Sequence, residues 1–132
     1  MKKSVFELAA RYVHPSVRRL LVETLRARGL KITEINRLLG VSPSSVTRYL
    51  KGERGVVIDL ADNPIVTDKI NKLASEIIEK KLNQYAVEEQ LVRITINIVA
   101  SKYLCKYHKK IEPGIDVEKC NICPRVFSNF AA

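Results

Sequence analysis

The sequence predicts a mainly α-helical fold with an N-terminal helix-turn-helix bundle, a helical dimerisation region and a small C-terminal metal-binding knuckle. Three observations lead to this prediction. Apolar residues recur at helical spacing along most of the chain, and two such segments meet at a Gly-Val-Ser-Pro turn at residues 40–43. All three cysteines and one of the two histidines gather between residues 105 and 123. We therefore divide the 132-residue chain into regions 1–62, 63–104 and 105–132.

The first apolar-periodic segment runs from Ser4 to Val13. We expect it to stop or bend at His14-Pro15, because proline disfavours helix at the residue before it. Ser16 would then cap a second helix, which is expected to end at Gly29. A lone histidine at such a junction is typical of a structural role, so His14 is given no function.

Residues 31–52 have the pattern of two helices around one tight turn. Thr33 is the candidate N-cap of the first helix, and Gly40 can take the left-handed conformation that the turn needs. Ser42 is expected to cap the second helix, and Pro43 falls at its first position, where a missing N–H costs nothing. The outward positions carry short hydroxyls followed by cations, which are side chains suited to the major groove of DNA. These positions are Ser44, Ser45, Thr47, Arg48 and Lys51.

The run TEINRLLGVSPSSVTRYLKGERG, residues 33–55, resembles the Cro and phage-repressor (XRE) type of helix-turn-helix domain, in the form found in short archaeal predicted transcriptional regulators. The similarity covers roughly residues 17–55. It implies that the helix beginning near Ser42 is the recognition helix, with Ser44, Ser45, Thr47 and Arg48 at base edges and Thr33, Lys51 and Arg54 nearer to phosphates. Many relatives carry glutamine at the start of each helix, whereas this chain has Thr33-Glu34 and Ser44-Ser45, so the family does not give the operator sequence. The expected DNA-binding set is Thr33, Ser42, Ser44, Ser45, Thr47, Arg48, Lys51 and Arg54.

The charge of the chain agrees with a nucleic-acid partner. There are 23 Lys and Arg against 14 Asp and Glu, a net charge of +9. Such a surface attracts polyanions and releases counterions when it meets phosphates. Many basic proteins do not read DNA, so it is the motif that points to double-stranded DNA. The alternative is a helix-turn-helix that serves as a protein-binding or winged scaffold.

The middle of the chain is expected to be helical. Val56 to Leu60 is predicted as a short strand or an extended connection, and turn residues at 62–64 mark the end of the first region. Thr67 to Leu82 has the pattern of an amphipathic helix. The segment from Val87 to Leu104 is compatible with helix, although Val92 to Ile98 alternates between apolar and polar as a strand would; length favours the helix. We expect a homodimer, because a two-fold operator needs two recognition helices.

Near the C-terminus, Cys105 and His108 form a Cys-x2-His pair, and Cys120 and Cys123 form a Cys-x2-Cys pair. Two such knuckles supply the four ligands of a tetrahedral site, so Zn²⁺ is the first choice of metal. An iron–sulfur cluster is the alternative, since thiolates with one imidazole can hold either. Free thiols beside a solvated histidine are the non-metal interpretation. Members of the family that the chain resembles often have a cysteine-rich C-terminal segment, commonly with a different order of Cys and His.

The expected function is a sequence-specific, double-stranded DNA-binding transcription regulator in the cytoplasm. No apolar stretch reaches the length of about 18 residues typical of a membrane helix, and no membrane partner is expected. Paired carboxylates, a nucleophile with its base and a phosphate-binding loop are not recognisable, so we expect neither an enzyme nor a small-molecule substrate. The alternative function is a protein-interaction adaptor that uses a zinc-stabilised tail and binds nucleic acid without sequence preference.

Overall fold

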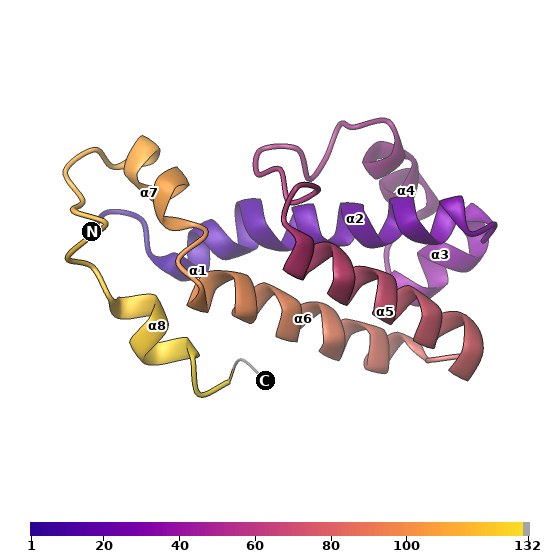
Figure 1. The fold of residues 1–132 in the computed structure, drawn as a ribbon. Coiled ribbons are helices and arrows are strands. Elements are labelled where there is room, and N and C mark those ends of the chain that lie inside the picture. Colours follow the sequence, from indigo (N-terminus) through magenta and orange to yellow (C-terminus); the bar gives the residue numbers. More distant parts are fainter. Residues whose placement is uncertain (131–132) are drawn as a thin grey trace.

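The structure, a computed structural model, describes residues 1–130, and the regular secondary structure in that span is helical (Figure 1). The mainly α-helical fold predicted from the sequence is therefore confirmed. No helix within these residues combines the length and the apolar character needed to cross a bilayer. The elements in order are α1 (Val5–Leu8), a π-helical segment (Ala9–Val13), α2 (His14–Ala27), α3 (Ile32–Leu39), α4 (Pro43–Leu50), α5 (Pro64–Lys80), α6 (Gln84–Ala100), α7 (Cys105–Ile111) and α8 (Ile122–Phe127).

Of the stop or bend expected at His14-Pro15, the stop is wrong, because helical backbone continues from Val5 to Ala27. Pro15 has no N–H to donate, and five residues of wider π-helix precede α2 at this point. Ser16 is not a cap either. It is buried, and its hydroxyl donates towards the carbonyl oxygens of Tyr12 (2.9 Å) and Gly55 (3.2 Å). The stop at Gly29 is confirmed: α2 ends at Ala27, and Gly29 adopts a φ of 96°.

Helix α2 is the central element of the fold. Helices α3 and α4 pack against one part of α2, and the long α5–α6 hairpin also packs along α2 (Figure 1). The inward side chains of α2, including Val17, Leu21 and Leu25, are fully buried. They belong to one apolar core together with buried residues of α3, α4, α5 and α6.

The α5–α6 hairpin agrees with the sequence pattern and extends it. Helix α5 begins three residues before the expected Thr67, because Asn63 caps it with Oδ1 and Pro64 fills the first position. Helix α6 begins after the cap Asn83 and includes all of residues 92–98, so the strand alternative for that segment is wrong. Residues 56–60 are a connection without strand pairing, pinned by the buried side chains of Ile58 and Leu60.

The inner faces of α5 and α6 are covered within the chain. Ile70, Leu73 and Ile77 of α5 and Leu91 and Ile98 of α6 are nearly inaccessible and lie in the common core. Such a pair of amphipathic helices more often forms an intramolecular core than a dimer interface, and the inner faces of α5 and α6 pack within the chain in this way.

Candidate nucleic-acid interface and cysteine cluster

Two short helices, α3 and α4, occupy the predicted region and are joined by residues 40–42. Gly40 has a left-handed φ of 66°, as the turn requires. Ser42 is the N-cap of α4, its Oγ accepting from the backbone N–H of Ser45 at 3.1 Å, and Pro43 follows at the first helical position. The positions expected for Gly40, Ser42 and Pro43 are therefore confirmed.

The predicted N-cap of the first helix is wrong. Helix α3 begins at Ile32, so Lys31 occupies the cap position and Thr33 lies inside the first turn, exposed. The carboxylate of Glu34 turns back to accept from the backbone N–H of Lys31 at 3.0 Å. This bond satisfies the Lys31 N–H at the start of the helix. It takes the place of the hydroxyl cap expected from Thr33.

Packing against α2 and α3 determines which face of α4 is exposed to solvent. Val46 and Tyr49 are buried against α2 and α3, together with Ile35 and Leu39 of α3. The opposite face carries the predicted DNA-binding side chains. Ser42, Ser44, Arg48, Lys51 and Arg54 are exposed, and Ser45 and Thr47 are half-buried.

Hydrogen bonds order part of this exposed face. The Ser45 hydroxyl lies 3.0 Å from the Ser42 hydroxyl and 3.2 Å from Nη1 of Arg54, which donates to it. The Thr47 hydroxyl donates to the carbonyl oxygen of Pro43 at 3.2 Å. Arg54 is thereby brought next to the start of α4, whereas Arg48 forms no such bond within residues 1–130.

The cations of this region have no acidic partners within residues 1–130. Arg18, Arg19 and Arg93, elsewhere in the chain, each form an ion pair with a glutamate. None of the ion pairs in the described residues involves a cation of α3, α4 or the turn after them. The positive charge at this surface is therefore available to an external polyanion. The cations concerned are Lys31, Arg37, Arg48, Lys51 and Arg54.

Two close approaches that the sequence did not indicate lie beside the helix pair. Gln84, at the start of α6, lies over Gly40, so a side chain at Gly40 would collide with the Gln84 amide. Gly55, with a φ of 71°, lies so close to the Pro15 carbonyl oxygen and the Arg19 Cβ that a methyl group would not fit. A glycine can signal a positive φ, but its tertiary neighbour is not visible in the sequence.

The four predicted metal ligands lie around one hollow of about 270 Å³. Cys105 and His108 come from α7, Cys120 from the following loop and Cys123 from α8, while residues 1 and 4–6 line the same hollow. Burial raises the pKa of the Cys105 and Cys123 thiols, and the neighbouring Cys120 thiol raises both further. All three thiols are free of disulfides.

These four side chains line the same hollow, but they do not point to one common position at which a metal ion could sit. Among residues 1–130, no group of three or more His, Cys, Asp or Glu side chains is arranged to hold a metal ion as it stands. The side chains would have to turn towards a common point inside the hollow. Their donor chemistry, three thiols and one imidazole, fits zinc or an iron–sulfur cluster.

Glu112 connects this hollow to the N-terminus. The buried Nε2 of His108 makes no hydrogen bond and faces Oε1 of Glu112 at 3.5 Å. The same carboxylate accepts from the backbone N–H groups of Lys3 and Lys2, and these bonds hold the pKa of Glu112 below its ordinary value. The first residues of the chain are thereby held beside the cysteine cluster.

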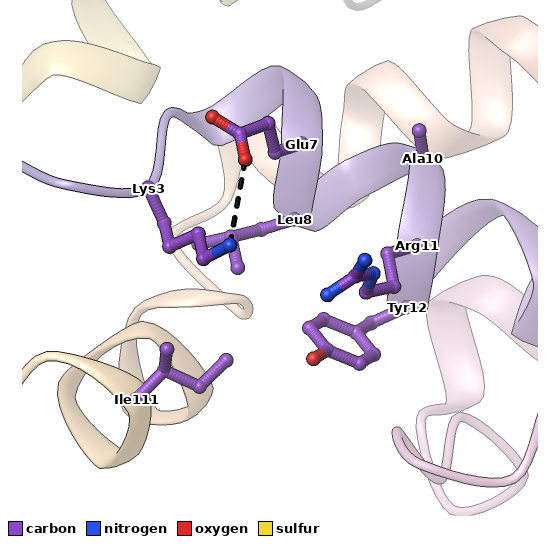
Figure 2. Close-up of a pocket in the computed structure, with 7 residues that line it drawn as sticks. All are labelled: Lys3, Glu7, Leu8, Ala10, Arg11, Tyr12 and Ile111. Carbon is purple, nitrogen blue, oxygen red and sulfur yellow. Dashed lines mark ion pairs between the residues drawn. The ribbon is translucent and has the colours of Figure 1, made fainter.

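A neighbouring hollow of about 340 Å³ lies between the N-terminal helical segment and α7. Figure 2 shows the Lys3–Glu7 ion pair (3.7 Å) at one side, with Arg11 and Tyr12 extending from the π-helical segment and Ile111 of α7 opposite. This hollow contains none of the residues that the sequence analysis selected.

No family model, curated protein or solved structure matches this chain.

Proposed function

We propose that the chain is a sequence-specific, double-stranded DNA-binding transcription regulator that inserts α4 into the major groove. The observation that carries the proposal is the exposed face of α4, where short hydroxyls lie beside Arg48 and the C-cap Lys51, neither of which has an acidic partner within residues 1–130, on a helix packed from behind. A B-DNA major groove admits one α-helix, and small side chains at the helix start permit a close approach.

In this proposal the side chains divide into two roles. Ser44, Thr47 and Arg48 read base edges, because they lie on the outward face of α4. Lys51 and Arg54, beyond the end of α4, contact phosphates and supply affinity without sequence preference. Thr33, Ser42 and Ser45 complete the interface, Ser42 and Ser45 mainly by ordering the start of the helix.

A homodimer is part of the proposal. One α4 covers only a half-site, and two-fold operators are read by two such helices about one helical turn of DNA apart or a multiple of it. Sedimentation equilibrium of the full chain, with and without operator DNA, measures this directly. A monomer that binds its best DNA site at a stoichiometry of one would contradict the dimer while leaving DNA recognition in place.

We further propose that Cys105, His108, Cys120 and Cys123 bind a metal, with Zn²⁺ first and an iron–sulfur cluster second. In support, all four line one hollow, and within residues 1–130 the buried Nε2 of His108 has no hydrogen-bond partner and only a 3.5 Å ion pair with Glu112. Zinc would add its binding free energy to the folding of the tail, whose helices α7 and α8 contain no fully buried residue. A cluster would instead make the tail responsive to oxidation.

A protein-interaction adaptor is the second candidate function. An apolar groove of about 360 Å³ lies between the N-terminal helical segment, α6 and α8, lined by Phe6, Val92, Phe127 and others. Phe6 is 70% exposed, and exposed apolar patches of this kind often mark interaction surfaces. This function predicts weak DNA binding without sequence preference.

Selection from a random duplex library separates the two functions. A regulator enriches a defined, two-fold sequence, and the full chain should bind it at least about 1,000-fold more tightly than unrelated DNA at physiological salt. An adaptor enriches nothing and shows equal, strongly salt-dependent affinity for all duplexes. The second result would overturn the proposed regulator.

A further inference from the structure

A polar hollow of about 330 Å³ lies between α5 and α6, away from α4 and from the cysteines. Helix α5 contributes Lys69, Lys72 and Glu76, and helix α6 contributes Gln90, Arg93 and Asn97. Leu73 and Ile94, both nearly buried, form apolar parts of its wall.

The two sets of polar side chains have the same spacing. In each helix the three positions are i, i+3 and i+7, which lie on one face of an α-helix. Because α5 and α6 pack against each other, these two polar edges border the same groove.

The hydrogen-bonding capacity of this groove is almost unused. Within residues 1–130, the side chains of Lys69, Lys72, Gln90 and Asn97 form neither a hydrogen bond nor an ion pair. Arg93 has a single long ion pair, 3.9 Å to Glu89 of its own helix, and both of these side chains are largely exposed. Three cations and two carboxamides therefore face one carboxylate, so the groove offers an excess of donors and of positive charge.

We propose that this groove binds a small phosphate-bearing anion. Lysine and arginine bind phosphate oxygens through charge-assisted hydrogen bonds, and the carboxamides of Gln90 and Asn97 can donate further bonds. Leu73 and Ile94 offer an apolar surface to the organic part of a phosphorylated molecule. The binding of this anion does not depend on the proposed DNA recognition.

The position of the groove gives such a ligand a route to the rest of the molecule. Helix α5 packs on α2, and helix α6 packs on α2 and α3. Gln84, at the start of α6, lies over the turn at Gly40. An anion that draws α5 and α6 together would thus act on the two elements that support the helix-turn-helix.

The test is a titration of the ¹⁵N-labelled full chain with inorganic pyrophosphate, with chloride at matched ionic strength as the blank. We expect saturable shifts at the side-chain amides of Gln90 and Asn97, with a dissociation constant of about 1 mM or tighter. The double substitution Lys72→Gln with Arg93→Gln should weaken binding by about tenfold or more. Lys80→Gln with Lys81→Gln removes the same charge at the end of the hairpin and should change affinity by less than about twofold.

Three results would overturn the proposal. The first is that pyrophosphate produces no saturable shift at these amides. The second is an equal loss of affinity in both double variants, which would mean non-specific attraction by net charge. The third is that a DNA duplex, but not pyrophosphate, shifts Gln90 and Asn97, which would assign the groove to the phosphates of the DNA backbone.

Discussion

The hydroxyl of Ser16 on α2 lies 3.2 Å from the carbonyl oxygen of Gly55, which follows it by 39 residues in the chain. This bond fastens the segment after α4 to the first turn of α2. Since Arg54 precedes Gly55 and bonds to Ser45 at the start of α4, the same contact fixes the position of a proposed phosphate-binding side chain.

Gly55→Ala should destabilise the fold. A non-glycine residue at a φ of 71° is strained, and the new methyl group would meet the backbone oxygen of Pro15, which cannot turn aside. We expect the free energy of unfolding in urea to fall by about 2 kcal/mol or more. Gly114→Ala is the matched control, because a Cβ there meets nothing within 4 Å. Equal effects of the two substitutions would contradict the tight approach of Gly55 to α2.

Arg48→Ala and Lys51→Ala should impair DNA binding in different ways. Arg48 lies on the outward face of α4, so its loss should lower discrimination between operator and variant sites by about 1–3 kcal/mol. Lys51 follows the end of α4, so its loss should weaken all sequences alike and reduce the salt slope by about 1. Fluorescence anisotropy with two duplexes at several salt concentrations measures both effects.

Lys80→Ala is the control for these two substitutions, because it removes one exposed charge from the end of α5. It should leave discrimination unchanged. If Arg48→Ala keeps full discrimination, the assignment of α4 as the recognition helix is wrong. If Lys80→Ala lowers the salt slope as much as Lys51→Ala does, DNA binding follows net charge alone.

His14 should make stability depend on pH. Its Nδ1 lies 2.9 Å from the Thr95 hydroxyl, and burial and then Arg18 lower its pKa below 6.5, against an opposing effect of Glu88. Between the two pKa values, the imidazole of His14 is therefore protonated in the unfolded chain and neutral in the folded chain. Stability is fully present above about pH 6.5 and falls as pH decreases towards the lowered pKa of the folded state.

The His14→Gln variant checks this dependence. Urea unfolding at several values between about pH 5 and pH 7 should show a shallower loss of stability in the variant than in the native chain. Thr95→Val, which removes the hydrogen-bond partner without removing a titrating group, should keep the pH dependence of the native chain. Identical slopes in His14→Gln and the native chain would show that another group causes the effect.

The cysteine hollow should hold one metal per chain after anaerobic purification. Elemental analysis should find zinc, and its removal by a chelator should lower Tm, because metal binding stabilises the tail. Cys120→Ser and His108→Gln should lose the metal, whereas His14→Gln, which changes the other histidine, should retain it. Iron with sulfide and visible absorption would establish the iron–sulfur alternative, and a chain without stoichiometric metal would contradict both.

Local signals in the sequence predicted most helix positions. The hydroxyl of Ser42, the proline after it and the left-handed Gly40 act within a few residues, so their effects can be read from the chain alone. The N-cap predicted at Thr33 is wrong because α3 begins at Ile32 and the Glu34 carboxylate accepts from the backbone N–H of Lys31 at the helix start. An amphipathic pattern such as that of α5 and α6 shows which face is buried, but not whether the partner is another helix or a second copy.

The sequence also predicted part of the candidate sites. The Cys-x2-His and Cys-x2-Cys pairs were expected to meet, and the structure places these four residues around one hollow. The contribution of Glu112 and the backbone of Lys2 and Lys3 could not be foreseen, because these groups are 109 and 110 positions apart. Likewise, the α5–α6 groove becomes visible only when two helices with the same polar spacing are placed face to face.

The central place of α2 has a consequence for how this molecule could be divided or recombined. The same helix is packed against α3 and α4 and against α5 and α6, so a fragment ending at residue 62 would leave part of its apolar surface in water. Cleavage in the connection between α4 and α5 should accordingly yield a nicked complex that stays associated, not two independent modules. The helix pair that faces outward could be grafted onto another protein only together with the scaffold behind it.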